Sequence, residues 1–117
     1  MGVFSFKNKN IKLEEAKEMK YSKDYTKLKL KEYTTIRRYP KGSVGKVVVE
    51  YYPSGKHYAR ITKIERKPFV DIPTDLLLDD TDTFTREEAF ELIQSFYKKP
   101  IDVFNEKLYI YHMRRLD

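Results

Sequence analysis

The sequence contains no cysteine and only two histidines. Without cysteine the chain forms neither a disulfide nor a thiolate metal site. His57 and His112 lie far apart in the sequence and have no nearby carboxylate pattern, so we expect them to pack rather than to bind zinc. The sequence therefore predicts no metal and no other cofactor.

Long apolar runs are also absent. No stretch approaches the roughly 20 residues that a membrane-spanning helix needs, and the first residues lack the apolar core of a secretory signal. We therefore expect a cytoplasmic protein that does not contact membranes. No glycine-rich phosphate loop or serine hydrolase motif occurs, so no strong local motif indicates catalysis.

The composition that is present favours one folded domain. The chain has 117 residues, of which 40% are hydrophobic and 15% aromatic, enough to form a single core. It also carries 24 lysine and arginine residues against 18 aspartate and glutamate residues, a net charge of +6. This excess favours a polyanionic partner such as nucleic acid.

Local patterns predict a mixed α+β fold with mainly antiparallel strands. We expect a short helix over residues 11–21, within an N-terminal extension of residues 1–21, and a second one over residues 22–31. Strands are predicted over residues 33–39, 46–52, 56–67 and 106–116. Pro53, Ser54 and Gly55 should close a hairpin over residues 46–66, and residues 68–84 read as a connecting segment.

Residues 85–97 give the clearest local signal, that of a capped amphipathic helix. Thr85 and Glu88 have the spacing of a capping box, and Phe84 is placed to pack against Ala89 as a hydrophobic staple. The apolar residues that follow at helical spacing should dock on a sheet; they are Ala89, Leu92, Ile93, Phe96 and Tyr97.

Four segments in this order resemble the ASCH domain, a small β-barrel related to the PUA fold. They are "KEYTTIRR" with "PKGSVGKVVVEY", "HYARITKIERKPFVDIPTD", "DTFTREEAFELIQSFY" and "EKLYIYHMRRL". The resemblance covers residues 22 to 117. It implies a PUA-like barrel with flanking helices and a cleft beside the basic first segment, suited to a nucleotide or an RNA segment.

Some members of that family hydrolyse N4-acetylcytidine with a lysine, a threonine and a glutamate, and others are reported as ribonucleases. Thr35 matches the threonine, while Glu32 stands at the lysine position with Lys31 beside it, and Asp82 takes the place of the glutamate. The resemblance thus implies catalytic candidates at Lys31, Glu32, Thr35 and Asp82. Asp82, together with Asp79 and Asp80, is equally well explained by a structural role, in a solvated loop or as a charge near the N-terminus of the following helix, as by a catalytic one.

A basic cluster precedes and follows the threonine. Its members are Lys27, Lys29, Lys31, Arg37, Arg38, Lys41 and Lys46, and they form either a solvated face or a phosphate-binding wall. Tyr33 and Tyr39 lie among these charges, where a base could stack on them. The predicted nucleic-acid contacts are therefore Lys31, Tyr33, Arg37, Arg38, Tyr39, Lys41 and Lys46.

Together these features predict a module that binds RNA or a nucleotide. The alternatives are an amidohydrolase acting on N4-acylated cytidine-type nucleosides, a nuclease acting on RNA, and a domain whose basic face meets an acidic protein.

Overall fold

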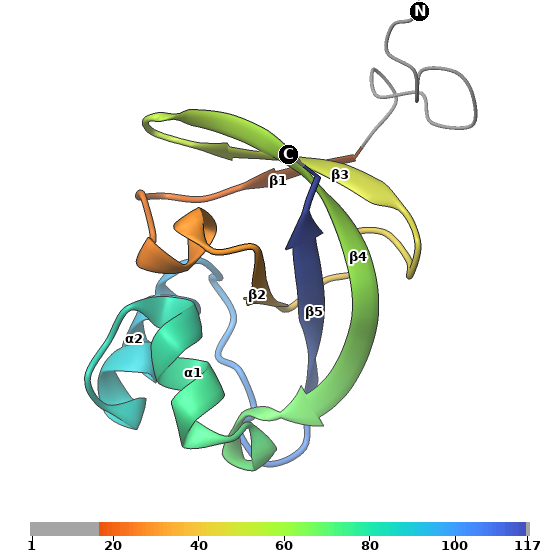
Figure 1. Cartoon of the computed structure of the whole chain (residues 1–117). Helices are drawn as coiled ribbons and strands as arrows, with labels where there is room; N and C mark the ends of the chain where they lie inside the picture. Colours follow the sequence, from red (N-terminus) through yellow and green to blue (C-terminus); the bar gives the residue numbers. More distant parts are fainter. Residues whose placement is uncertain (1–16, 117) are drawn as a thin grey trace, which may run out of the picture.

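The computed structural model describes residues 17–116. It is an α+β domain with one five-stranded mixed sheet and two α-helices (Figure 1). The elements in chain order are β1 (Lys17–Lys20), the 3-10 helix η3 (Thr26–Lys29), β2 (Glu32–Arg37), β3 (Val47–Tyr52), β4 (Gly55–Pro68), the 3-10 helix η4 (Phe69–Asp71), α1 (Thr74–Thr81), α2 (Arg86–Ser95) and β5 (Lys107–Arg115).

The strands are arranged in the order β1-β3-β4-β5-β2. Strand β1 runs parallel to β3, and the other three pairings are antiparallel. The two ends of this order, β1 and β2, are not paired to each other in the described part of the chain, so the sheet is open there.

The hairpin predicted between residues 46 and 66 is confirmed. Tyr52 pairs with Gly55, so Pro53 and Ser54 form a two-residue connection between β3 and β4. The predicted strands corresponding to β2 and β5 are also confirmed. Strand β4 is long and strongly curved (Figure 1), and its register with β5 shifts between Ile61 and Lys63. This bulge and curvature let one strand pair with β3 at its start and with β5 along the rest.

Each face of the sheet carries its own hydrophobic cluster. On the first face, Tyr25 and Leu28 beside and within η3 pack against residues from all five strands: Met19, Tyr33, Val48, Ala59, Ile61, Tyr111 and Met113. On the second face, α1 and α2 cover Ile36, Leu108 and Ile110. No helix of residues 17–116 covers the second face of the β1, β3 and β4 end (Figure 1).

Helix α2 forms where the sequence predicts it. Thr85 is its N-cap and accepts a hydrogen bond from Glu88 N at 3.0 Å. The Glu88 carboxylate in turn accepts a hydrogen bond from Phe84 N at 2.9 Å. The predicted staple is wrong, because the Phe84 side chain is 90% exposed. Ala89 and Ile93 are buried as expected, whereas Phe96 is half exposed.

The predictions for the N-terminal region need correction. The helix expected over residues 11–21 is wrong for Lys17–Lys20, which form β1; residues 11–16 of this prediction lie outside the described residues. Pairing with β3 imposes this strand on a segment of good helix formers. Strand β1 belongs to the predicted N-terminal extension, residues 1–21, and is nevertheless part of the sheet. The helix expected over residues 22–31 is only the short η3.

The segment predicted as a connection, residues 68–84, contains η4 and α1. Helix α1 has Pro73 at its N-cap and no side-chain cap, and it ends at Asp82, whose backbone is left-handed with φ 56°. Among residues 17–116, no helix combines the length and apolar character needed to cross a membrane.

Candidate functional site

A cavity of about 440 Å³ opens beside β2, between the end of β1, η3 and the two α-helices. Its volume lies within the range of small-molecule sites. One part of the wall is polar and the α2 side is mostly apolar. The lining residues are Lys20, Tyr21, Ser22, Tyr25, Lys27, Thr35, Ile36, Arg37, Asp80, Thr81, Leu92, Ile93, Phe96 and Tyr97.

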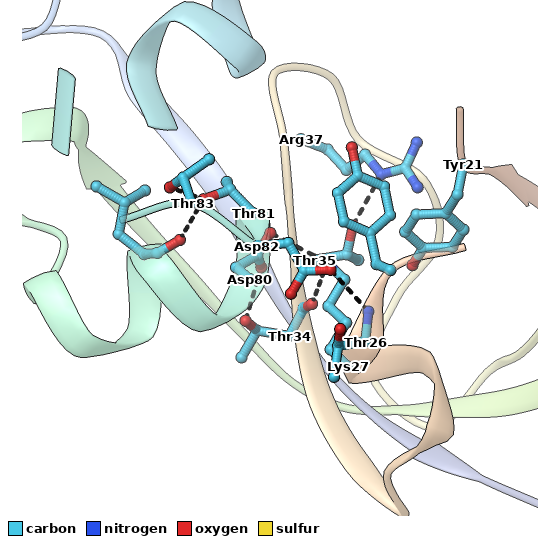
Figure 2. Close-up of polar contacts among 12 residues, drawn as sticks. Tyr21, Thr26, Lys27, Thr34, Thr35, Arg37, Asp80, Thr81, Asp82 and Thr83 are labelled. Atoms are coloured by element: carbon cyan, nitrogen blue, oxygen red, sulfur yellow. Dashed lines mark hydrogen bonds and ion pairs between the residues drawn. The ribbon is translucent and has the colours of Figure 1, made fainter. Parts of the chain in front are cut away.

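The polar part is built around a buried ion pair. Lys27 Nζ lies 3.0 Å from Asp80 Oδ1, and both side chains are only 5% exposed. Lys27 Nζ also donates to the Thr34 carbonyl at 2.7 Å, and Asp80 Oδ2 accepts from Thr34 Oγ1 at 2.7 Å. Figure 2 shows η3, β2 and α1 meeting at these three side chains. The pair thus ties the 3-10 helix and α1 to the edge strand.

The hydrogen bonds of Lys27 within residues 17–116 do not use its full donor capacity. An ammonium has three donors, and two of them are used by Asp80 and by the Thr34 carbonyl. Burial lowers the pKa of Lys27, and the Asp80 carboxylate opposes this shift in part. The rings of Tyr21 and Tyr25 lie 5.3 and 5.4 Å from Nζ, so they complete an aromatic surround for the cation.

Thr35 and Arg37 form the neighbouring part of the wall. Arg37 Nε donates to Thr35 Oγ1 at 3.1 Å, and the Arg37 guanidinium lies 4.9 Å from the Tyr21 ring centroid. Thr35 is 2% exposed. Within residues 17–116, β2 is an edge strand of the open sheet, so no further described strand pairs with it on the side away from β5.

A second buried polar cluster lies behind the cavity. The Glu50 carboxylate accepts hydrogen bonds from the hydroxyls of Tyr21 and Tyr33 and lies 2.9 Å from His57 Nε2. His57 Nδ1 lies 3.0 Å from the Tyr52 hydroxyl. Burial would raise the pKa of Glu50, but the hydrogen bonds from His57, Tyr21 and Tyr33 hold it below its usual value. Through Tyr21 this cluster supports one wall of the cavity.

Of the four catalytic candidates, Thr35 alone lines the cavity. Glu32 is exposed and lies 3.4 Å from Arg114, and Lys31 is exposed outside the lining. Asp82 accepts a hydrogen bond from Thr26 N at 2.8 Å and so anchors the start of η3 (Figure 2). The lysine and the carboxylate that line the cavity together with Thr35 are instead Lys27 and Asp80.

The predicted nucleic-acid contacts are dispersed. Arg37 lines the cavity, but Arg38 is held by Glu106 at 2.7 Å and by two backbone carbonyls. Tyr33 is buried against Glu50 and His57.

The remaining predicted contacts are exposed. The Tyr39 ring lies edge-on to Tyr97, with centroids 5.7 Å apart, near the cavity. Lys41 and Lys46 lie in the segment between β2 and β3.

Sequence reasoning placed Lys27 in the basic cluster without separating it from its neighbours. Lys27, Lys29 and Lys31 alternate with apolar residues, and the sequence contains no local signal that one of them is buried. No group of histidine, aspartate and glutamate side chains suited to a metal ion occurs within residues 17–116.

The fold and the site define a small α+β domain with an open mixed sheet and a lysine-aspartate cavity at its edge. The chain is 35% identical over 105 residues to an uncharacterized protein, MJ0364, of the archaeon Methanocaldococcus jannaschii, and the match covers 80% of this chain and 92% of that protein. The chain therefore belongs to the same family as this archaeal protein. No family model and no solved structure matches the chain.

Proposed function

We propose that the protein is an ASCH-type, PUA-like domain whose cavity binds a nucleoside unit of RNA. The observation that carries this proposal is the set of Lys27, Thr35 and Asp80 around one cavity. In this proposal the strongly curved sheet corresponds to the PUA-like barrel, with the cavity at the opening between β1 and β2. A cytoplasmic location also stays a prediction.

The chemistry of the wall supports a nucleobase as the ligand. Cytosine offers an amino donor that a carboxylate such as Asp80 accepts, and ring acceptors that Lys27 and Thr35 are suited to satisfy. Bases of single-stranded RNA stack on aromatic rings and guanidinium planes, which Tyr97, Phe96 and Arg37 supply at the same cavity. A phosphate attached to the nucleoside would be favoured by the cations at the rim.

The first experiment measures binding of cytidine by calorimetry to the native chain and to Lys27→Arg and Thr35→Val variants. Both variants should weaken binding at least about tenfold, since each removes or displaces a donor in a site of low dielectric. Lys29→Gln is the matched control, because Lys29 belongs to the same 3-10 helix but is exposed. Unchanged affinity in both cavity variants, with native circular dichroism, would rule out this cavity as the binding site.

The surface around the cavity is tested with RNA. Arg37→Ala combined with Lys41→Ala should lower both the affinity for a cytidine-rich oligonucleotide and the salt dependence of binding. If affinity and salt slope stay as in the native chain, these two residues do not contact the phosphates.

A second candidate is hydrolysis of an N4-acylated cytidine-type nucleoside. The lowered pKa of Lys27 favours it, because a buried amine beside a carboxylate is suited to proton transfer. In the reaction, water adds to the acyl carbon, the bond from that carbon to N4 breaks, and N4 takes up a proton, giving cytidine and a carboxylate. Incubating the protein with N4-acetylcytidine should then release cytidine, whereas a binding module releases none and the Lys27→Arg variant should release less.

A further inference from the structure

The second face of the β1, β3 and β4 end carries tyrosines and cations in neighbouring rows. In one row Lys20, Tyr51 and Lys56 lie opposite one another on three strands. Tyr58 follows Lys56 by two residues on β4 and so lies on the same face. Arg60 follows Tyr58 by two more and pairs with Arg114 of β5. We call these six residues, Lys20, Tyr51, Lys56, Tyr58, Arg60 and Arg114, the outer tyrosine face.

The charge of this face is mainly positive and largely uncompensated. In the described part of the chain, no ion pair involves Lys20, Lys56 or Arg60. The Lys56 ammonium lies 5.8 Å from the Tyr51 ring centroid, and Arg60 Nη1 donates to the Gly45 carbonyl at 2.7 Å. Two carboxylates lie on the same side of the sheet. Glu32 Oε2 is 3.4 Å from Arg114 Nε, and Glu18 of β1 lies opposite Val49 of β3.

The spacing of the tyrosines suits consecutive bases. Tyr51 and Tyr58 are diagonal neighbours on adjacent antiparallel strands, which places such side chains about 7–8 Å apart. Both side chains are half-buried, so they are braced against the sheet while part of each ring meets solvent. Proteins that bind single strands combine such rings with cations that follow the backbone.

The outer tyrosine face is continuous with the cavity. Lys20 belongs to both, because this β1 residue pairs with Tyr51 of β3 and also lines the cavity beside Tyr21. An RNA strand that crosses β4, β3 and β1 would therefore reach the cavity mouth at the same edge of the sheet.

We propose that the outer tyrosine face binds single-stranded RNA and directs it toward the cavity. Bases stack on Tyr51 and Tyr58, and phosphates contact Lys56, Arg60, Arg114 and Lys20. The proposal rests on the proposed function, since the strand bound here is the one whose nucleoside enters the cavity.

The experiment compares two ligands on the same variants. Fluorescence anisotropy measures binding of a labelled oligocytidine of about eight nucleotides, within the usual site size for single strands. Calorimetry measures binding of free cytidine. The variants are Lys56→Gln with Arg60→Gln, and Tyr58→Leu, which keeps an apolar side chain on the strand. Lys107→Gln is the control, since Lys107 is an exposed cation at the opposite end of β5 from Arg114.

We expect the double variant to weaken oligocytidine binding and to reduce the salt slope by about 0.7 for each cation removed. Tyr58→Leu should weaken binding roughly tenfold through lost stacking, with the salt slope unchanged. Cytidine binding should be unchanged in both, and Lys107→Gln should match the native chain with both ligands.

The outcomes separate this proposal from the proposed function. If the outer-face variants bind oligocytidine like the native chain, the face is not the RNA path, even where cytidine binding still depends on Lys27. If cytidine fails to bind but oligocytidine binding depends on Tyr58 and Arg60, the face is supported and the cavity proposal fails. If polyglutamate displaces oligocytidine as well as unlabelled RNA does, the face binds acidic chains in general and the proposal is overturned.

Discussion

Two buried carboxylates, Asp80 in the cavity lining and Glu50 outside it, differ in what surrounds them. Asp80 lines the cavity and is paired with Lys27. Within residues 17–116, two of the three donors of the Lys27 ammonium have a hydrogen-bond partner, namely Asp80 and the Thr34 carbonyl. Glu50 is enclosed by Tyr21, Tyr33 and His57 and is 0% exposed. The comparison indicates that the Glu50 cluster stabilises the fold, whereas the Lys27 and Asp80 pair also presents polar groups to the cavity.

Removing the Glu50 carboxylate should have the largest effect on stability. Glu50→Ala leaves the hydroxyls of Tyr21 and Tyr33 and the His57 ring without the carboxylate that they contact, so we expect a loss of about 4 kcal/mol in the free energy of unfolding. Urea unfolding measures it. Glu32→Ala is the control, because Glu32 is 66% exposed and should change stability by less than about 0.5 kcal/mol. Similar small losses in both variants would refute a structural role for the cluster.

Breaking the cavity pair should have the next largest effect. Lys27→Met leaves the Asp80 carboxylate buried without a cation, which should cost about 3 kcal/mol in the free energy of unfolding. Adding Asp80→Asn should recover part of this loss, because the uncompensated charge is removed. A double-mutant cycle in urea gives the coupling energy. A double variant as unstable as the sum of both single variants would show that the two side chains act independently.

The pH dependence of stability should distinguish the clusters further. The folded-state pKa of Glu50 is below its ordinary value of 4.5, so its contribution is complete above that value and is lost as the pH falls through the lowered pKa. Native stability should therefore decline below about pH 4.5, and Glu50→Gln should reduce the slope of this decline. Unfolding curves at several acidic pH values measure it; an identical slope in the variant would assign the acid sensitivity to other groups.

The smallest expected effect comes from Thr85, the N-cap of α2, which belongs to neither cluster. Its loss in the free energy of unfolding serves as a reference for the losses expected at Glu50 and Lys27. Thr85→Ala removes the N-cap bond to Glu88 N and should cost about 1 kcal/mol. Thr85→Ser keeps the hydroxyl and should remain close to the native value in the same thermal and urea unfolding measurements. If Thr85→Ala lowered the free energy of unfolding more than Lys27→Met, the order of effects expected from side-chain burial would be wrong.

The elements with strong local signals were predictable. The capping residues of α2 act within one turn, and the hairpin turn at Pro53 and Ser54 lies between two runs of strand formers. Strand β1 was not predictable in this way. Its residues Lys17–Lys20 favour a helix locally, and only pairing with β3 and burial of Met19 make them a strand.

The site could be predicted only in part, for the same reason. Thr35 was predicted because it matches the threonine of the ASCH motif, and Arg37 because it belongs to the basic cluster around it. Lys27 and Asp80 are brought together from η3 and α1, and nothing local separates Lys27 from Lys29, or Asp80 from Asp79. Which member of each set is buried depends on how α1 packs against β2, a long-range contact that periodicity does not encode.

The pairing of β2 with β5 also has a consequence for how the protein is made. Within the described sheet, β2 bonds to no other strand, and the partners of Thr35 and Arg37 are Tyr111 and Tyr109. During translation the ribosome therefore releases the cavity-lining strand long before its neighbour exists. The nascent chain has to keep β2 from other partners until β5 emerges, so the cavity is completed only after β5 has been synthesised.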